Sequence, residues 1–253
     1  NAAGLLPVVG LNWEVDLDTH TLDEYKFLWD YVVARYGAHA ITWLICTEYN
    51  KGGKSPGIVA KMMALGAYIK QIDPYKRAMS VHPWGYFGDK REAWDQPWMD
   101  FIMAHGGHRG HNQVPATKGY QEAWEYQPTR PVVESECSYE GILHKARMAT
   151  ADDVRRVAYH AIQAGCFGYT YGSHGLWYPT QSPHDKNYTN WGKRTVWWNA
   201  LRRPGEVQMT HLRKCYESVE WWKLTPRPGA VGKLFSRGLA AALLFRAAPL
   251  IAA

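Results

Sequence analysis

Two glutamates at the ends of apolar segments are well placed to do chemistry. Glu48 follows the apolar run Ile41–Cys46, and Glu136 ends the run that starts at Pro131. When two carboxyl groups flank one bond, one can protonate the leaving oxygen while the other attacks carbon or activates water. Glycoside hydrolysis needs this arrangement. The pair therefore predicts carboxylate chemistry of that kind.

The residues around these glutamates suggest how the two carboxyl groups would differ. Aromatic walls such as Trp43 or Trp84 would desolvate an acid at Glu48 and help it to keep its proton. Glu134 and Glu136 have the same strand parity, so both side chains point to one side of the strand. We expect the deeper Glu134 to hold partners in place, and Glu140, in the following loop, to orient the site.

The elements that must position these residues alternate along the chain. Apolar runs predict six strands, at 5–12, 41–46, 77–82, 98–104, 131–136 and 166–171. Amphipathic segments predict helices at 22–36, 58–71, 116–127, 151–164, 191–201 and 204–223. Strands that alternate with helices of this length indicate parallel βαβ units. Because the strands are nearly continuous apolar runs, we expect both faces of the sheet to be covered.

The polar and aromatic residues gather where these strands end, which is typical of a (β/α)8 TIM barrel. A closed barrel of this type has eight strands, so we expect the first two to precede Asn1 and the barrel of this chain to be incomplete. We predict one β/α-barrel domain over residues 1–228 and a C-terminal tail at 229–253. A doubly wound open sheet is the alternative, but no glycine-rich phosphate loop follows any strand.

The composition excludes several other classes. The 253 residues are 46% hydrophobic and 21% charged, which excludes global disorder. A mean hydropathy of −0.41 argues against a polytopic membrane protein. The net charge of +6 is spread along the chain, so we expect neither nucleic acid nor a membrane as a partner. Aromatic residues make up 14%, and we expect one or two of the following loop residues to stack on sugar rings: Trp84, Trp94, Trp98, Trp177, Tyr178 and Trp191.

Several motifs, in order, resemble the apiosidase-like glycoside hydrolases, a family of β/α barrels. The segment from Pro131 through Glu136 to Tyr139-Glu140-Gly141 is similar to that family's Pro…Glu-x-x-Tyr-Glu-Gly signature. Segment 43–48 resembles its strand-4 motif, and segment 100–108 resembles its strand-6 motif. Segments 165–172, 208–212 and 221–226 are similar to its strand 8 and closing helix. The resemblance covers about residues 5–228.

The resemblance implies a retaining mechanism with Glu48 as general acid/base and Glu136 as nucleophile. It also implies a sugar subsite lined by His82, Trp84, His108 and Tyr171. Residues at the other strand ends complete the predicted substrate-binding set: Trp13, Asn50, Tyr139, Glu140 and Trp177. We expect a carbohydrate substrate, no cofactor and no metal. By resemblance, the protein is expected to be secreted or periplasmic in a bacterium.

Two alternatives stay open at this level. His105, His108 and His111 recur at every third position of a glycine-rich loop, which permits a metal site. However, the sequence has neither a His-x-His after a strand nor a His-Glu-x-x-His helix, so a polar loop with one substrate-binding histidine is favoured. The second alternative is a non-catalytic, carbohydrate-binding remnant of such a barrel, which the two missing strands suggest. It predicts binding without turnover.

Overall fold

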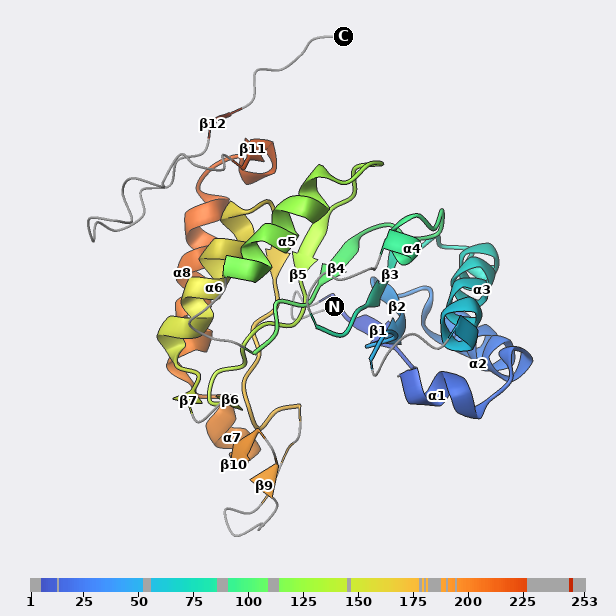
Figure 1. Cartoon of the computed structure of the whole chain (residues 1–253), viewed down its shortest axis with the longest axis horizontal. Coiled ribbons are helices and arrows are strands. Elements are labelled where there is room, and N and C mark those ends of the chain that lie inside the picture. The colour runs from blue at the N-terminus through green and yellow to red at the C-terminus, as the bar shows by residue number, and fades with distance from the viewer. Residues whose placement is uncertain are drawn as a thin grey trace. The chain divides into compact units, whose positions relative to one another are not determined.

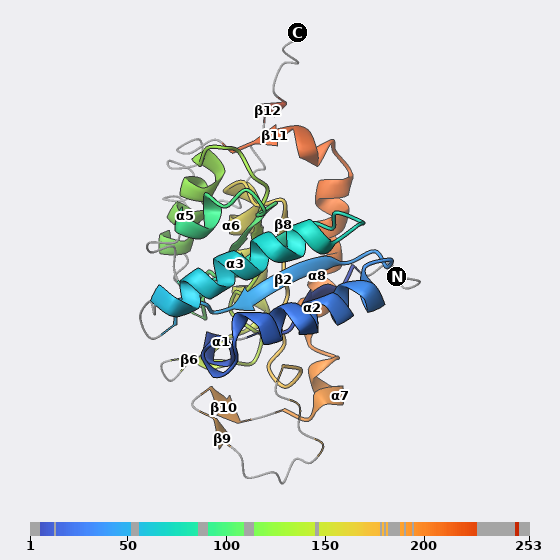
Figure 2. The same ribbon diagram turned by 90° about the vertical axis from the view of Figure 1, so that its right-hand side faces the viewer.

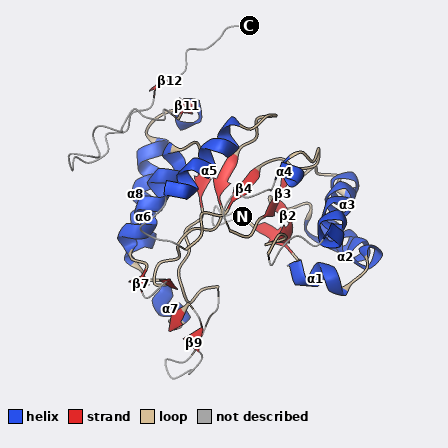
Figure 3. Cartoon of the chain, viewed as in Figure 1, coloured by secondary structure: helices blue, strands red, loops and turns tan. Residues whose placement is uncertain are grey.

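The computed structural model describes residues 6–12, 14–51, 56–85, 91–108, 114–144, 147–177, 179, 181, 188–189, 191–193, 195–226 and 246–247. They form two compact units. The first draws on residues 1–105 and 126–135, and the second on residues 106–125 and 136–253. Helices and strands are present in both units (Figure 1; Figure 3). The prediction of a single domain over residues 1–228 stays a prediction.

The first unit is built from parallel strands covered by helices. β1 (Val8–Gly10), β2 (Thr42–Thr47) and β3 (Met79–His82) pair in parallel in that order, and β4 (Ile102–Ala104) pairs in parallel with β5 (Val132–Glu134). α2 (Leu22–Tyr36) and α3 (Pro56–Ile72) connect the first three strands and pack against each other (Figure 2). Short helices α1 (Glu14–Thr19) and α4 (Arg91–Trp94) complete the unit. The predicted parallel pairing is confirmed for these strands.

Tryptophans fill the core between this sheet and its helices. The rings of Trp29 and Trp43 are fully buried and meet edge to face, with centroids 5.6 Å apart. The Trp43 indole N–H donates to Asp73 Oδ2 at 2.9 Å. Trp43 therefore packs on α2, and its expected role in desolvating the acid at Glu48 stays a prediction. Trp94 and Trp98 are also buried, so they serve packing and not sugar stacking.

The second unit combines helices with short strands. α6 (Ala151–Gln163) packs along α8 (Pro204–Glu217) and also contacts α5 (Val114–Glu125) (Figure 1). Ala158, Leu212 and Tyr216 form an apolar cluster in this unit. The remaining elements are short: β8 (Gly168–Tyr169), α7 (Trp197–Ala200), the 3₁₀ turn Trp221–Lys223, and three antiparallel strand pairs, namely β6 (Leu143–His144) with β7 (Arg147–Met148), β9 (Tyr188–Thr189) with β10 (Gly192–Lys193), and β11 (Leu224–Thr225) with β12 (Arg246–Ala247).

The six predicted strands correspond to β1, β2, β3, β4, β5 and β8. Their closure into a barrel stays a prediction. The predicted helix at 191–201 is wrong, because β10 occupies its start and α7 only its end. Gly192 has a φ of +94°, which side-chain-bearing residues rarely adopt, and a Cβ there would lie 2.7 Å from the Leu143 Cβ. Among the described residues, no helix has the length and apolar character that crossing a bilayer demands.

Asp153, in the first turn of α6, is buried and tied to the residues before the helix. The Thr150 N–H and hydroxyl each donate to Asp153 Oδ2 at 2.8 Å. The Arg147 guanidinium donates to both carboxylate oxygens, at 2.9 and 3.1 Å. Burial alone raises the pKa of the Asp153 carboxyl, but the hydrogen bonds from Arg147 and Thr150 outweigh it, so the pKa lies below its usual value.

We expect Asp153→Asn to lower the free energy of unfolding at neutral pH by about 2 kcal/mol, because it removes the ion pair and half of the capping box. Since the native pKa is lowered, the wild-type contribution is fully present above about pH 3.9 and is lost as the pH falls through the native value. Urea unfolding at neutral and acidic pH measures this. Asp152→Asn, at an exposed neighbouring position, is the control. If the difference in free energy of unfolding between wild type and Asp153→Asn were the same at neutral and acidic pH, the expectation would be contradicted.

Candidate active site

Glu48 lies in a tight turn directly after β2, in the first unit. Its side chain is buried, and its backbone φ is +53°, in the left-handed region. The Glu48 N–H donates to the His82 carbonyl at 2.7 Å, and the Glu48 carbonyl accepts from the Lys51 N–H at 2.9 Å. This conformation costs a non-glycine residue about 1–2 kcal/mol. Strain of this kind concentrates at functional sites, so the turn is a candidate for function.

Lys51 makes an ion pair with Glu48 inside the same turn. Its ammonium donates to Glu48 Oε2 at 2.6 Å, and the Lys51 side chain is 44% exposed. An adjacent ammonium favours the ionised carboxylate, which is the form that a general base uses. Lys51 is not among the residues predicted from the sequence, although its place three residues after Glu48 was a usable signal.

The loop after β3 is fastened to this turn. Asn50 Oδ1 accepts a hydrogen bond from the Trp84 N–H at 2.7 Å, so Asn50 joins the two loops. The Trp84 side chain is 48% exposed and offers a ring for stacking. His82 is buried, and its ring lies 5.2 Å from that of His105, which is buried too. The first unit thus brings together Glu48, Asn50, His82 and Trp84.

Glu136 and His108 form a pair in the second unit. His108 Nε2 lies 3.3 Å from Glu136 Oε1, and the two side chains are 12% and 15% exposed. His108 Nδ1 lies 2.9 Å from the Cys137 carbonyl oxygen. The Gly107 N–H donates to the Glu136 carbonyl at 3.1 Å. These contacts fix the loop before α5 to the segment that carries Glu136.

Aromatic rings surround His108 in this unit. The rings of Tyr139 and Trp191 lie 4.7 and 5.1 Å from the His108 ring, measured between centroids. Trp177 follows 6.2 Å beyond Tyr139, and His144 lies nearly parallel to Trp191 at 6.3 Å. Trp191 and His144 are outside the predicted substrate-binding set. Trp191 stood among the loop aromatics, whereas no sequence pattern pointed to His144.

Glu140 is buried and accepts two hydrogen bonds. The Tyr171 hydroxyl donates to Glu140 Oε2 at 2.7 Å, and the Gly205 N–H in the first turn of α8 donates to the same oxygen at 2.9 Å. A carboxylate is favoured at a helix N-terminus, where N–H groups lack helical partners. Burial, and then the hydrogen bond to Glu140, raise the pKa of Tyr171 above its ordinary value. Glu140 therefore positions Tyr171, and its contact with substrate stays a prediction.

Gly205 leaves room for Glu140. A Cβ on Gly205 would overlap the Glu140 carboxylate and lie 2.9 Å from Val154 Cγ2. We expect Gly205→Ala to lower the free energy of unfolding by about 1–3 kcal/mol through overpacking, as measured by urea unfolding. Gly57→Ala is a matched control, because Gly57 also follows the first proline of a helix but is exposed. Equal stabilities of the two variants would show that the Glu140 site tolerates the added methyl.

The second unit thus brings together Glu136, His108, Tyr139 and Trp177 through ring contacts and the His108–Glu136 contact, and it joins Glu140 to Tyr171 by a hydrogen bond. Glu134, expected to be the deeper of two glutamates on its strand, is fully buried in the first unit. Three residues singled out from the sequence lie outside the described residues: Trp13, His111 and Tyr178.

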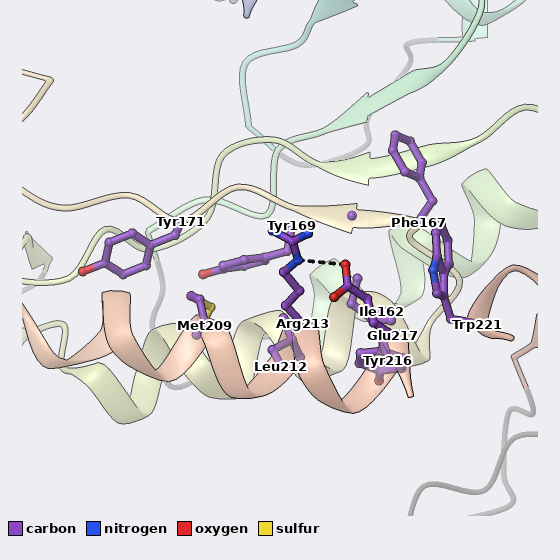
Figure 4. Close-up of a pocket in the computed structure, with 11 residues that line it drawn as sticks. Ile162, Phe167, Tyr169, Tyr171, Met209, Leu212, Arg213, Tyr216, Glu217 and Trp221 are labelled. Carbon is purple, nitrogen blue, oxygen red and sulfur yellow. Dashed lines mark hydrogen bonds and ion pairs between the residues drawn. The ribbon is translucent and has the colours of Figure 1, made fainter. Parts of the chain in front are cut away.

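A separate, mainly apolar cavity of about 330 Å³ lies in the second unit between β8 and α8 (Figure 4). Its walls include Ile162, Tyr169, Met209, Leu212 and Trp221, and Tyr171 contributes from the predicted site. Arg213 donates to Glu217 at 2.7 Å on the α8 wall, as the dashed line in Figure 4 shows. No function was predicted for this cavity from the sequence.

Comparisons with known proteins agree with one another. A family model described as "Apiosidase-like, catalytic domain" matches residues 2–223. A solved structure described as a glycoside hydrolase superposes with a TM-score of 0.71 at 25% identity, over 87% of this chain and 53% of its own. A glycoside hydrolase family 5 structure from Bacteroides vulgatus superposes with a TM-score of 0.73 at 24% identity, over 87% and 51%. Among curated proteins there is no match. The chain spans about half the length of these structures.

Proposed function

Because this chain belongs to the apiosidase-like catalytic domain family, we propose that it cleaves O-glycosidic bonds in oligo- or polysaccharides as a retaining glycoside hydrolase. The observation that carries the proposal is the placement of Glu48 and Glu136 within the matched segment. Glu48 directly follows β2, and Glu136 lies two residues after β5. The strands would belong to a (β/α)8 barrel, in which active-site residues come from these carboxyl ends.

In the proposed mechanism, Glu136 attacks the anomeric carbon while Glu48 gives its proton to the departing glycosidic oxygen. A covalent glycosyl–enzyme ester results. Glu48, now ionised, then takes a proton from water as the water oxygen bonds to the anomeric carbon and releases Glu136. The proposal requires Lys51, whose side chain is 44% exposed, to move off Glu48 when the sugar enters, since an acid must hold its proton before donating it.

Sugar recognition would use the exposed aromatic rings near each glutamate. The side chains of Trp84 and Trp177 are 48% and 45% exposed, so their faces are accessible to the apolar face of a sugar ring. Tyr171 donates its hydroxyl proton to Glu140 and would meet a sugar hydroxyl as an acceptor. His82 and His108 would supply further polar contacts. These roles, with those of Asn50 and Tyr139, are proposals.

The test is to incubate the full chain with a panel of aryl glycosides and to identify the first-formed anomer by proton NMR. We expect release of a sugar whose anomeric configuration is that of the substrate. A first product of the opposite configuration would overturn the retaining mechanism.

Carbohydrate binding without turnover is the second candidate function. It is favoured by one observation, namely that Lys51 pairs with Glu48 at 2.6 Å, which favours the ionised carboxylate over the protonated acid that turnover requires. Calorimetric titration with the same glycosides distinguishes the two functions. Binding with no product at high protein concentration would replace the proposed hydrolase with this second function.

A further inference from the structure

The contacts of His108 restrict where its protons lie. Nδ1 lies 2.9 Å from the Cys137 carbonyl oxygen, which only accepts hydrogen bonds, so Nδ1 carries a hydrogen. A neutral imidazole has a single N–H, and its other nitrogen is then an acceptor. That other nitrogen, Nε2, lies 3.3 Å from Glu136 Oε1. An ionised carboxylate also only accepts, so a neutral His108 facing an ionised Glu136 would place two acceptors together.

We propose that His108 Nε2 carries a hydrogen that faces Glu136 Oε1, which makes His108 a cationic positioning residue for the nucleophile. The functional part of this inference rests on the proposed role of Glu136, whereas the protonation of Nε2 rests on the contacts alone. Both side chains are largely buried, at 12% and 15% exposure. A largely buried carboxylate is stabilised by an adjacent imidazolium, which brings both an opposite charge and an N–H donor.

Aromatic and titratable side chains pack around the imidazole. The Tyr139 and Trp191 rings lie 4.7 and 5.1 Å from the His108 ring, with interplanar angles of 57° and 74°. Titratable neighbours of the pair include the Tyr139 phenol and, 6.3 Å from Trp191, the His144 ring. Rings packed on two sides restrict the rotation of the imidazole and keep Nε2 facing Glu136.

The hydrogen on His108 Nε2 gives Glu136 a fixed orientation through both chemical steps. Before attack, the contact between the His108 N–H and Oε1 fixes the orientation of the Glu136 carboxylate plane. If Oε2 bonds to the anomeric carbon, Oε1 becomes the carbonyl oxygen of the ester and still accepts from His108. The proton stays on His108 throughout, so the step balances without a further acid or base.

The direct test is nitrogen NMR of the full chain labelled with ¹⁵N-histidine, with the His108 signals assigned by their loss in His108→Gln. At neutral pH we expect both His108 ring nitrogens to carry hydrogen in wild type. In Glu136→Gln we expect Nε2 to lose its hydrogen, because the amide can donate to it. A neutral His108 ring in wild type would overturn the inference. A neutral His108 ring would not contradict the proposed glycoside hydrolysis, which is tested separately by product formation. Failure of this inference and failure of the proposed function are therefore distinguishable.

Activity provides the second readout. We expect His108→Leu, which removes the donor, to lower kcat/KM by about 10²-fold, through misplacement of Glu136. His108→Gln, which keeps an N–H donor, is expected to recover part of that loss. The control is His211→Gln, at an exposed histidine of α8, which should behave as wild type. Equal losses for His108→Leu and His108→Gln would contradict the positioning role, because only one of them removes the N–H donor.

Discussion

Replacing Glu136 by glutamine is expected to lower kcat/KM on an aryl glycoside by about 10⁴-fold or more, as loss of a catalytic nucleophile does. The amide has the shape of the carboxyl group but is a far weaker nucleophile. The variant loses the proposed ion pair with His108, so we expect a stability loss of about 1 kcal/mol, or roughly 2–4 °C in the thermal midpoint. Initial rates and thermal unfolding measure the two effects separately.

The nucleophile role has its own chemical signature. In Glu136→Ala, added azide can attack the anomeric carbon from the face that the missing carboxylate would have used. The expected product is a glycosyl azide of inverted configuration, with the rate partly restored. Glu122→Gln, at an exposed position of α5, is the matched control and should behave as wild type. If Glu136→Gln kept more than a tenth of wild-type activity, another residue would have to be the nucleophile.

Local signals explain where the sequence predicted the fold well. The predicted helix at 22–36 coincides with α2, because Thr21 and Glu24 form a capping box that is visible in the sequence. The strand before Glu48 was recognisable for a similar reason, as an unbroken apolar run. The predicted helix at 191–201 failed because residues 192–193 pair with β9, and because Leu143, distant in the sequence, donates its N–H to the Trp191 carbonyl.

The sequence predicted which residues belong to the candidate site but not which residues hydrogen-bond to them. Asn50 and Glu140 were selected because they lie near strand ends. Their partners Trp84 and Gly205 are 34 and 65 residues away in the chain. Such contacts form only in the folded chain, so the sequence alone could not separate residues that bind substrate from residues that hold others in place. The left-handed backbone of Glu48 was equally invisible, since its residue type gives no sign of it.

Replacing Glu48 by glycine is expected to lower activity by about 10²–10⁴-fold on substrates with poor leaving groups, which need a general acid. The same change should leave the fold almost as stable as wild type. At a φ of +53°, glycine removes a strain of about 1–2 kcal/mol, which offsets the roughly 0.4–1 kcal/mol that glycine costs through the unfolded chain. This single variant would therefore lose activity while keeping nearly the thermal stability of wild type.

The leaving group shows whether Glu48 acts as the acid/base. The leaving group of an activated aryl glycoside needs little protonation. In Glu48→Gly, formation of the glycosyl–enzyme ester should therefore be nearly as fast as in wild type, and its hydrolysis should become rate-limiting. Azide, which needs no general base, should then restore turnover and give a product of retained configuration, the opposite of Glu136→Ala. Lys76→Gly is the matched control, because Lys76 has a φ of +51° and an exposed side chain without a role in the proposed site. Equal losses for good and poor leaving groups would show that Glu48 supports the turn after β2 and transfers no proton.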